Sequence, residues 1–153
     1  MRVAIAAVIG YVVYFICIAV TYSILWIAVG AGFAYHPGTA RVTTGWLLAS
    51  TPLTLIGAAF AGWLATKIAK RFTGAKALAA LVLIRGLAFG VMNLNKDRSL
   101  PPGKSPATLS AQEAGQYSIQ PTWYDFTIAV LAAGAVLDGG RKRQHEGARV
   151  PAA

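Results

Sequence analysis

Apolar residues are gathered in four long runs, and polar or charged segments separate them. The runs cover residues 3–29, 45–68, 77–94 and 122–140. A helix needs about 20 apolar residues to cross the hydrocarbon core of a bilayer. The pattern therefore predicts an all-α fold, an integral membrane four-helix bundle forming a single transmembrane domain.

The first and last runs allow other interpretations. Small residues follow residues 3–29, so a cleaved signal peptide is an alternative, but the apolar region of such a peptide is only about 7–15 residues long. We therefore prefer an uncleaved helix. In the last run, Asp125 and Asp138 bracket a short uncharged stretch, so a re-entrant segment is the alternative to a crossing. We favour a crossing, because Trp123 and Tyr124 at the start of this run suit an interfacial belt and a basic cluster, residues 141–143, follows it.

The second run contains two tryptophans and a proline. Trp46 near its start and Trp63 near its end are expected in the two headgroup regions, which indole rings prefer. Pro52 removes the backbone donor that the carbonyl of Leu48 would use, so we predict a kink there. The hydroxyl of Thr51 or a neighbouring helix is expected to compensate.

A polar connector, residues 95–121, separates the third and fourth runs. Its prolines and glycine resist regular structure, so we expect it in water outside the membrane. Ser110 and Glu113 have the spacing of a capping box, in which each side chain satisfies a free amide at a helix start. This spacing predicts a short surface helix near residues 111–117.

Basic residues are distributed unevenly about the four predicted spans. The side with both chain ends would hold Arg2, Lys67, Lys70, Arg71, Lys76, Arg141, Lys142, Arg143 and Arg149. The other side would hold Arg41, Lys96, Arg98 and Lys104. The positive-inside rule therefore places both termini and a basic tail, residues 141–153, in the cytoplasm and the connector outside. Helical spans favour a bacterial cytoplasmic (inner) membrane over an outer one.

Composition narrows the possible partners. The chain is 56% hydrophobic and only 12% charged, with a formal net charge of +9. Its basic residues flank apolar runs instead of lining a water-soluble recognition element, so we expect no nucleic-acid partner. The lipid bilayer is the expected partner, together with a membrane protein or a second copy of this chain.

Small residues at helical spacing provide candidate contacts between the helices. Helices in lipid pair mainly where small side chains let their backbones approach. The candidates are Gly86 and Gly90, Ala58 and Gly62, and Ala129 and Ala133. We expect these residues to pack within one chain, with a homodimer face as the alternative.

Arg85 is the unusual residue of the third run, because it falls near the middle of the predicted span. An unpaired arginine there costs about 2.5–3.5 kcal/mol on insertion scales. We predict an intramembrane polar cluster of Arg85, Tyr14 and Thr54, with Asp125 or Asp138 as counter-ion. Such a cluster could be an anion or proton site. Otherwise the arginine is a packing device, snorkels to the interface or pairs with a partner subunit.

No other residues specify chemistry. Cys17 is the only cysteine, which excludes an intramolecular disulfide. His36 and His145 are predicted on opposite sides of the membrane and so could not share a metal ion. Glu113 and Asp125 could face the same side, but their spacing specifies no reaction. We predict no catalytic residue, no metal ligand and no cofactor.

Three segments carry a resemblance to other proteins. Residues 34–39 read Ala-Tyr-His-Pro-Gly-Thr, residues 57–62 form the small-residue stripe Gly-Ala-Ala-Phe-Ala-Gly, and residues 120–124 read Gln-Pro-Thr-Trp-Tyr. Together they resemble an uncharacterised family of small four-helix bacterial membrane proteins. The resemblance implies a topology and supplies no activity, cofactor or functional residue.

The leading hypothesis is a non-catalytic integral membrane protein that serves as an accessory, assembly or structural subunit. The alternative is a small transporter or channel with an intramembrane site at Arg85, and the third possibility is a membrane enzyme. A subunit needs a stable partner, a transporter needs a wet path to Arg85, and an enzyme needs a pocket that joins several polar groups.

Overall fold

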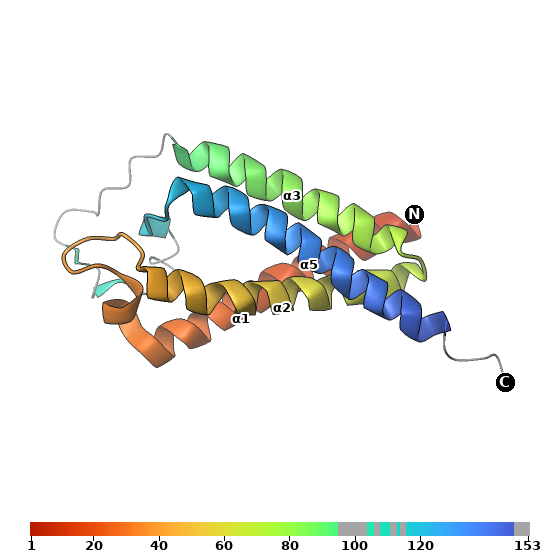
Figure 1. Ribbon diagram of the computed structural model, residues 1–153, viewed down its shortest axis with the longest axis horizontal. Helices are drawn as coiled ribbons and strands as arrows, with labels where there is room; N and C mark the ends of the chain where they lie inside the picture. The colour runs from red at the N-terminus through yellow and green to blue at the C-terminus, as the bar shows by residue number, and fades with distance from the viewer. Residues whose placement is uncertain (95–103, 106–107, 111–112, 114–115, 149–153) are drawn as a thin grey trace.

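The computed structural model describes residues 1–94, 104–105, 108–110, 113 and 116–148. Four long helices account for most of them: α1 (Arg2–Ala34), α2 (Thr44–Ala69), α3 (Thr73–Leu94) and α5 (Thr122–Ala148) (Figure 1). Among the described residues there are also short turns and two isolated β-bridges. The predicted all-α fold of four helices is confirmed.

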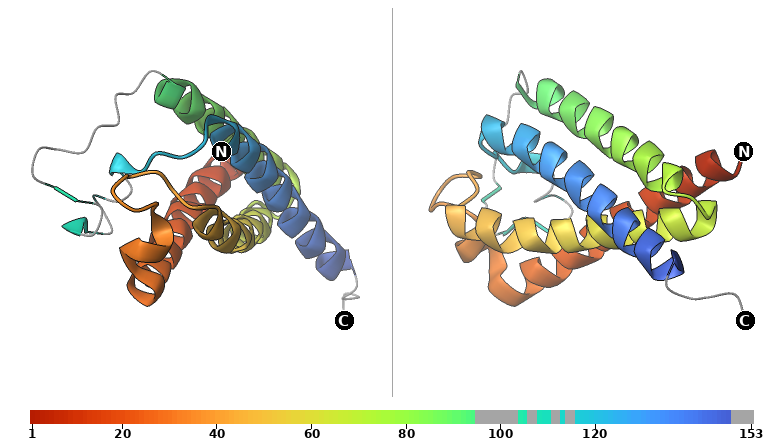
Figure 2. Two further views of the ribbon diagram at one scale, coloured as in Figure 1. Left: turned by 60° about the vertical axis from the view of Figure 1, so that its left-hand side comes forward. Right: turned by 45° about the vertical axis from the view of Figure 1, so that its right-hand side comes forward.

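The helices pack side by side along their lengths. Contacts join α5 to both α2 and α3, and α1 to the same two helices. The start of α1, the turn between α2 and α3, and the end of α5 lie at one end of the bundle, which we call the basic end (Figures 1 and 2). The loop at residues 35–43 and the start of α5 lie at the opposite end, the loop end.

The interior contains mainly small side chains, whereas the outer surface carries many large apolar ones. Ala58, Ala61 and Ala65 are fully buried, and the largest fully buried side chains are only Leu78, Val136 and Ser50. The exposed large apolar residues lie on all four helices. By length and hydropathy, α1, α2 and α3 could each cross a membrane. The last helix is long enough but more polar.

Glycines allow α2 and α5 to touch through their backbones. Gly62 lies against the carbonyl group of Val136, and Gly139 lies against that of Ala59. A side chain built on either glycine would overlap the opposite backbone. Ala58 is fully buried on the same helix as Gly62. At these two glycines, α2 and α5 therefore cross in direct backbone contact.

Glycines also allow α3 and α5 to approach each other closely. A Cβ atom on Gly86 would lie 2.5 Å from the Cβ of Ala129, and one on Gly90 would lie 3.0 Å from the ring of Phe126. These two glycines of α3 therefore face α5 within the same chain.

The helix ends differ from the predicted runs in the charged segments. The last helix continues to Ala148, although residues 141–153 were expected to form a tail. Lys142 pairs with Asp138 one turn earlier at 2.8 Å, which supports the helix beyond the apolar run. The third helix likewise begins at Thr73, before Lys76. Charges mark where an apolar run stops, but a helix can continue past them.

The break in helical backbone lies in α1. Gly30 has φ 69° and ψ 177°, a region that only glycine readily adopts. In α2 the helix continues through Pro52. The hydroxyl of Thr51 donates to the carbonyl of Leu47 at 2.7 Å, one residue before the Leu48 carbonyl that was expected to need a donor.

Candidate functional site

Arg85 lies on the outer surface of the bundle, where α3 meets α1. Its guanidinium carbon is 4.9 Å from the ring centre of Phe15 and 5.4 Å from that of Tyr11. The side chain is exposed, and both rings belong to α1. Arginine can interact favourably with aromatic faces at these distances. Arg85 therefore presents a positive charge on an otherwise apolar face.

The other residues of the predicted cluster lie in different surroundings. The hydroxyl of Thr54 donates to the carbonyl of Ser50 in its own helix, at 3.0 Å. Asp138 is exposed and pairs with Lys142 at 2.8 Å. Tyr14 is partly buried against the small-residue core. The contacts described for these three residues are thus with groups other than Arg85, and the predicted cluster stays a prediction.

Asp125 is buried near the start of α5, with 6% of its surface exposed. The side-chain amide of Asn93, at the end of α3, donates to its carboxylate at 3.3 Å. This contact holds the α3 end against the α5 start at the loop end of the bundle. Asp125 therefore joins α5 to the end of α3. Arg85 lies about two turns earlier, near the middle of α3.

A second polar contact, which sequence reasoning missed, joins α2 to α5. The hydroxyl groups of Thr51 and Tyr124 are 2.9 Å apart, and Tyr124 is buried. Tyr124 was assigned to the interfacial belt because it follows Trp123. Trp123 is 62% exposed, as such a belt requires, while the neighbouring tyrosine points inward. Two adjacent aromatic residues on a helix face different directions, which could have indicated this difference.

An aromatic cluster closes the loop end. Trp26 lies edge-on to Tyr35 at 5.7 Å and to Trp46 at 6.0 Å. Tyr22 also packs against Trp46. Trp46 is only 6% exposed, because it packs against the tyrosine and tryptophan of α1. Its position in a headgroup region stays a prediction.

The later part of the connector folds back onto this cluster. Ile119 forms a parallel bridge with Arg41, and the hydroxyl groups of Tyr35 and Ser118 are 2.7 Å apart. Burial raises the pKa of Tyr35, and the Ser118 contact opposes that shift. Leu109 is buried in the same cluster. These connector residues therefore belong to the packed structure, although we had expected the whole connector to lie in water.

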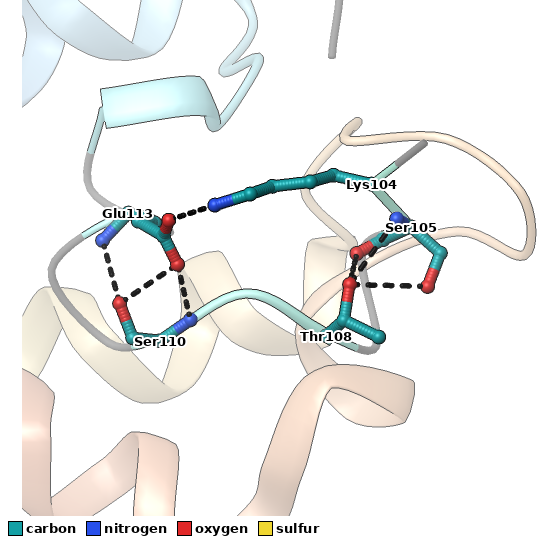
Figure 3. Close-up of polar contacts among 5 residues, drawn as sticks. All are labelled: Lys104, Ser105, Thr108, Ser110 and Glu113. Atoms are coloured by element: carbon teal, nitrogen blue, oxygen red, sulfur yellow. Dashed lines mark hydrogen bonds and ion pairs between the residues drawn. The ribbon is translucent and has the colours of Figure 1, made fainter. Parts of the chain in front are cut away.

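The capping box in the connector is confirmed. The amide and hydroxyl of Ser110 each donate to Glu113 at 3.0 Å, and the Glu113 amide donates back to the serine hydroxyl at 3.3 Å (Figure 3). Lys104 forms an ion pair with the same carboxylate. The lysine contact and the serine donors lower the pKa of Glu113 to about 2. Glu113, Gln116 and Tyr117 are helical, while Ala111 lies outside the described residues.

The described residues make their polar contacts at separate places in the bundle. Within the described part of the chain, no three His, Cys, Asp or Glu side chains come together to hold a metal ion. Comparison of the chain with protein-family models, curated proteins and solved structures gives no match. Among the described residues, Arg85 is thus distinctive as a cation on an apolar outer face.

Proposed function

We propose that this chain is an integral protein of a bacterial cytoplasmic membrane, with four transmembrane helices and both termini in the cytoplasm. Large apolar side chains cover its outside and small ones fill its interior. In water, exposed apolar surface is unfavourable by about 25 cal/mol per Å². In hydrocarbon the same surface is in its preferred environment. This distribution supports membrane insertion of the whole bundle.

The proposal includes α5 as the fourth span. This helix packs against α2 and α3, both of which are apolar enough to cross. Its 27 residues would measure roughly 40 Å, enough to span. Asp125 is covered at one end, and Asp138 is paired with Lys142 at the other. The neighbouring helices therefore reduce the cost of its polar residues, and the basic end would face the cytoplasm.

The proposed role is that of a non-catalytic accessory, assembly or structural subunit. Its partner is a membrane protein that supplies a carboxylate from a transmembrane helix to Arg85. The observation that carries this proposal is the exposed position of Arg85, near the middle of α3 and against the rings of Tyr11 and Phe15. Stacking on aromatic rings contributes about 0.5–2 kcal/mol. An arginine at mid-membrane costs about 2.5–3.5 kcal/mol or more, so a carboxylate would offset the remainder.

The same position weighs against the alternative of a transporter or channel. A transported ion would need a path through the bundle to Arg85, whereas this residue faces outward. The crossings at Gly62 and Gly86 are closed by direct contact with α5. Intramembrane charges that line a pathway usually face a bundle interior or a wet cavity. An outward arginine fits recognition of another helix better.

The proposal is tested by the dependence of a partner on Arg85. The tagged full-length chain would be purified in mild detergent, and proteins that co-elute in stoichiometric amount would be identified. We expect Arg85→Leu to lower the amount of retained partner at least about tenfold, because the interhelical ion pair is lost. Arg85→Lys should retain part of it, since the charge remains.

Arg71→Leu is the matched control, because it removes one exposed positive charge at the basic end. It should leave the partner bound. Arg85→Glu should lose the partner, and exchanging the partner's carboxylate for arginine should restore it. A chain that elutes without a stoichiometric partner, or equal losses in the Arg71 and Arg85 variants, would show that the subunit proposal is wrong.

A further inference from the structure

A groove lies between α2 and α5 at the basic end of the bundle. It measures about 330 Å³ and is lined by Ala59, Phe60, Trp63, Gly139 and Lys142. Its residues come from the last turns of α2 and from the part of α5 where charged residues begin. Trp63 lies roughly 9 Å before the end of α2, at about 1.5 Å per residue.

The groove has an apolar half that the helix crossing produces. Gly139 touches the carbonyl of Ala59, so the floor between the helices contains no large side chain. The rings of Phe60 and Trp63 stack above it, with centres 6.0 Å apart and planes 15° apart. Phe60 is half exposed. A hydrocarbon chain could lie on this surface without displacing any charged group.

Positive side chains lie beside the groove, against the ring of Trp63. The ammonium of Lys67 lies 4.8 Å from the ring centre of Trp63, and the guanidinium of Arg143 lies 5.9 Å from it. Lys142 also borders the groove and pairs with Asp138 at 2.8 Å. Lys67 and Arg143 therefore lie against the same indole ring, and Lys142 borders the groove. Positive side chains gathered here favour an anion.

We propose that this groove binds one anionic phospholipid, with its phosphate between Lys67 and Arg143 and an acyl chain on Ala59 and Phe60. Basic pockets between transmembrane helices on the cytoplasmic side suit anionic headgroups. Free phosphate would satisfy the cations but would leave the apolar half empty, so the lipid is the better fit. The proposal rests on the membrane location proposed above, and it is independent of Arg85 and its partner.

The test counts lipids bound to the intact protein by native mass spectrometry. Full-length protein in mild detergent would be titrated with phosphatidylglycerol and, separately, with phosphatidylcholine of identical acyl chains. One phosphatidylglycerol should bind preferentially. The double variant Lys67→Gln, Arg143→Gln should bind it at least about tenfold more weakly, because both phosphate contacts are lost.

The control variant, Arg71→Gln with Lys76→Gln, removes the same charge from exposed positions at the same end. It should change the affinity less than about twofold, which separates a specific site from general attraction. Equal weakening in both variants, or equal binding of phosphatidylcholine, would overturn the proposal. Displacement of the lipid by an equal concentration of inorganic phosphate would also overturn it, because the groove would then be an ion site.

Membrane location is measured separately, by testing whether the chain stays with membranes during alkaline carbonate extraction. A chain that is extracted would contradict the membrane proposal itself. A chain that stays, but shows no preference for phosphatidylglycerol, would contradict only the lipid site.

Discussion

At the scale of single residues, small side chains decide how closely the helices approach. Gly62 meets the backbone of Val136, whereas Gly134 on α5 has no other group within 4 Å of the place a Cβ would occupy. Both are helical glycines with ordinary backbone angles. The two positions therefore differ in whether a Cβ would meet another helix, so one serves as the control for the other.

We expect Gly62→Ala to lower the free energy of unfolding by about 1–3 kcal/mol, because α2 and α5 must move apart. Gly134→Ala should instead raise it by up to about 1 kcal/mol, since alanine favours helix and meets nothing. Unfolding by sodium dodecyl sulfate in mixed micelles, followed by circular dichroism, would measure both. Equal effects of the two substitutions would contradict the close crossing.

The residue scale also shows what a sequence can and cannot reveal about the candidate site. The position of Arg85 along its helix could be read from its distance to the charged residues around the run. Its direction could not, because α3 is apolar around most of its circumference and gives no periodic signal. Tyr14 and Thr54 were chosen as partners by their expected depth alone, and depth does not say which face of a helix a residue occupies.

At the scale of elements, the helical backbone of α1 is interrupted at Gly30. Gly30 has a positive φ, and a Cβ at this position would have no group within 4 Å. Any cost of a side chain there would come from backbone strain and not from collision. A Cβ on Gly32 would likewise have no group within 4 Å, and the φ of Gly32 lies in the ordinary range.

Gly30→Ala is expected to cost about 1–3 kcal/mol, because alanine disfavours that backbone conformation. Gly32→Ala should change stability by less than about 1 kcal/mol. The same detergent unfolding experiment distinguishes them. If Gly30→Ala were as stable as the natural chain, residue 30 would have to adopt helical angles. That result would contradict the interruption of α1 at this position.

The ends of the elements were less predictable than their existence. The four apolar runs correctly located the four helices, since lipid-compatible composition is a strong signal over this length. Lys76 and residues 141–148 were placed outside helices because charge was treated as a boundary. Charge marks the edge of hydrocarbon, and α3 and α5 continue through charged residues. The capping box of Ser110 was predictable because its contacts are local.

At the scale of the whole molecule, the proposed topology depends on whether α5 crosses the membrane. Ser105 lies in the connector and Gln144 near the end of α5, and both are exposed. If α5 crosses, they lie on opposite sides of the membrane. If it does not, they lie on the same side. A single introduced cysteine at each position can report this difference.

In a Cys17→Ala background, we expect Ser105→Cys to react with a membrane-impermeant maleimide in intact bacterial cells. Gln144→Cys should react only after the cells are permeabilised, because it would face the cytoplasm. Labelling of both positions in intact cells would instead place the end of α5 outside and contradict the fourth span. Cys17→Ala alone is the control for background labelling.

Contacts between distant segments were the least predictable feature of the molecule. The bridge between Arg41 and Ile119, and the packing of Trp46 against Trp26, join parts of the chain that no local pattern relates. Both depend on how the helices are rotated and where the connector returns. Sequence alone gave the composition of these segments but not their neighbours.

The alanine-filled interior has a consequence for how this chain can change over evolution. In the proposed membrane, exposed positions such as Ile27 and Met92 could exchange one large apolar side chain for another, since lipid would accept any of them. Ala61 and Gly62 have no such freedom, because any larger side chain would meet α5 or its neighbours. Exposed apolar positions should therefore tolerate exchange among large apolar residues, whereas interior positions should accept only small ones. In a water-soluble bundle the exposed positions are polar and the interior ones are large and apolar. Distant relatives of this chain should share its spacing of small residues while most of their bulky side chains differ.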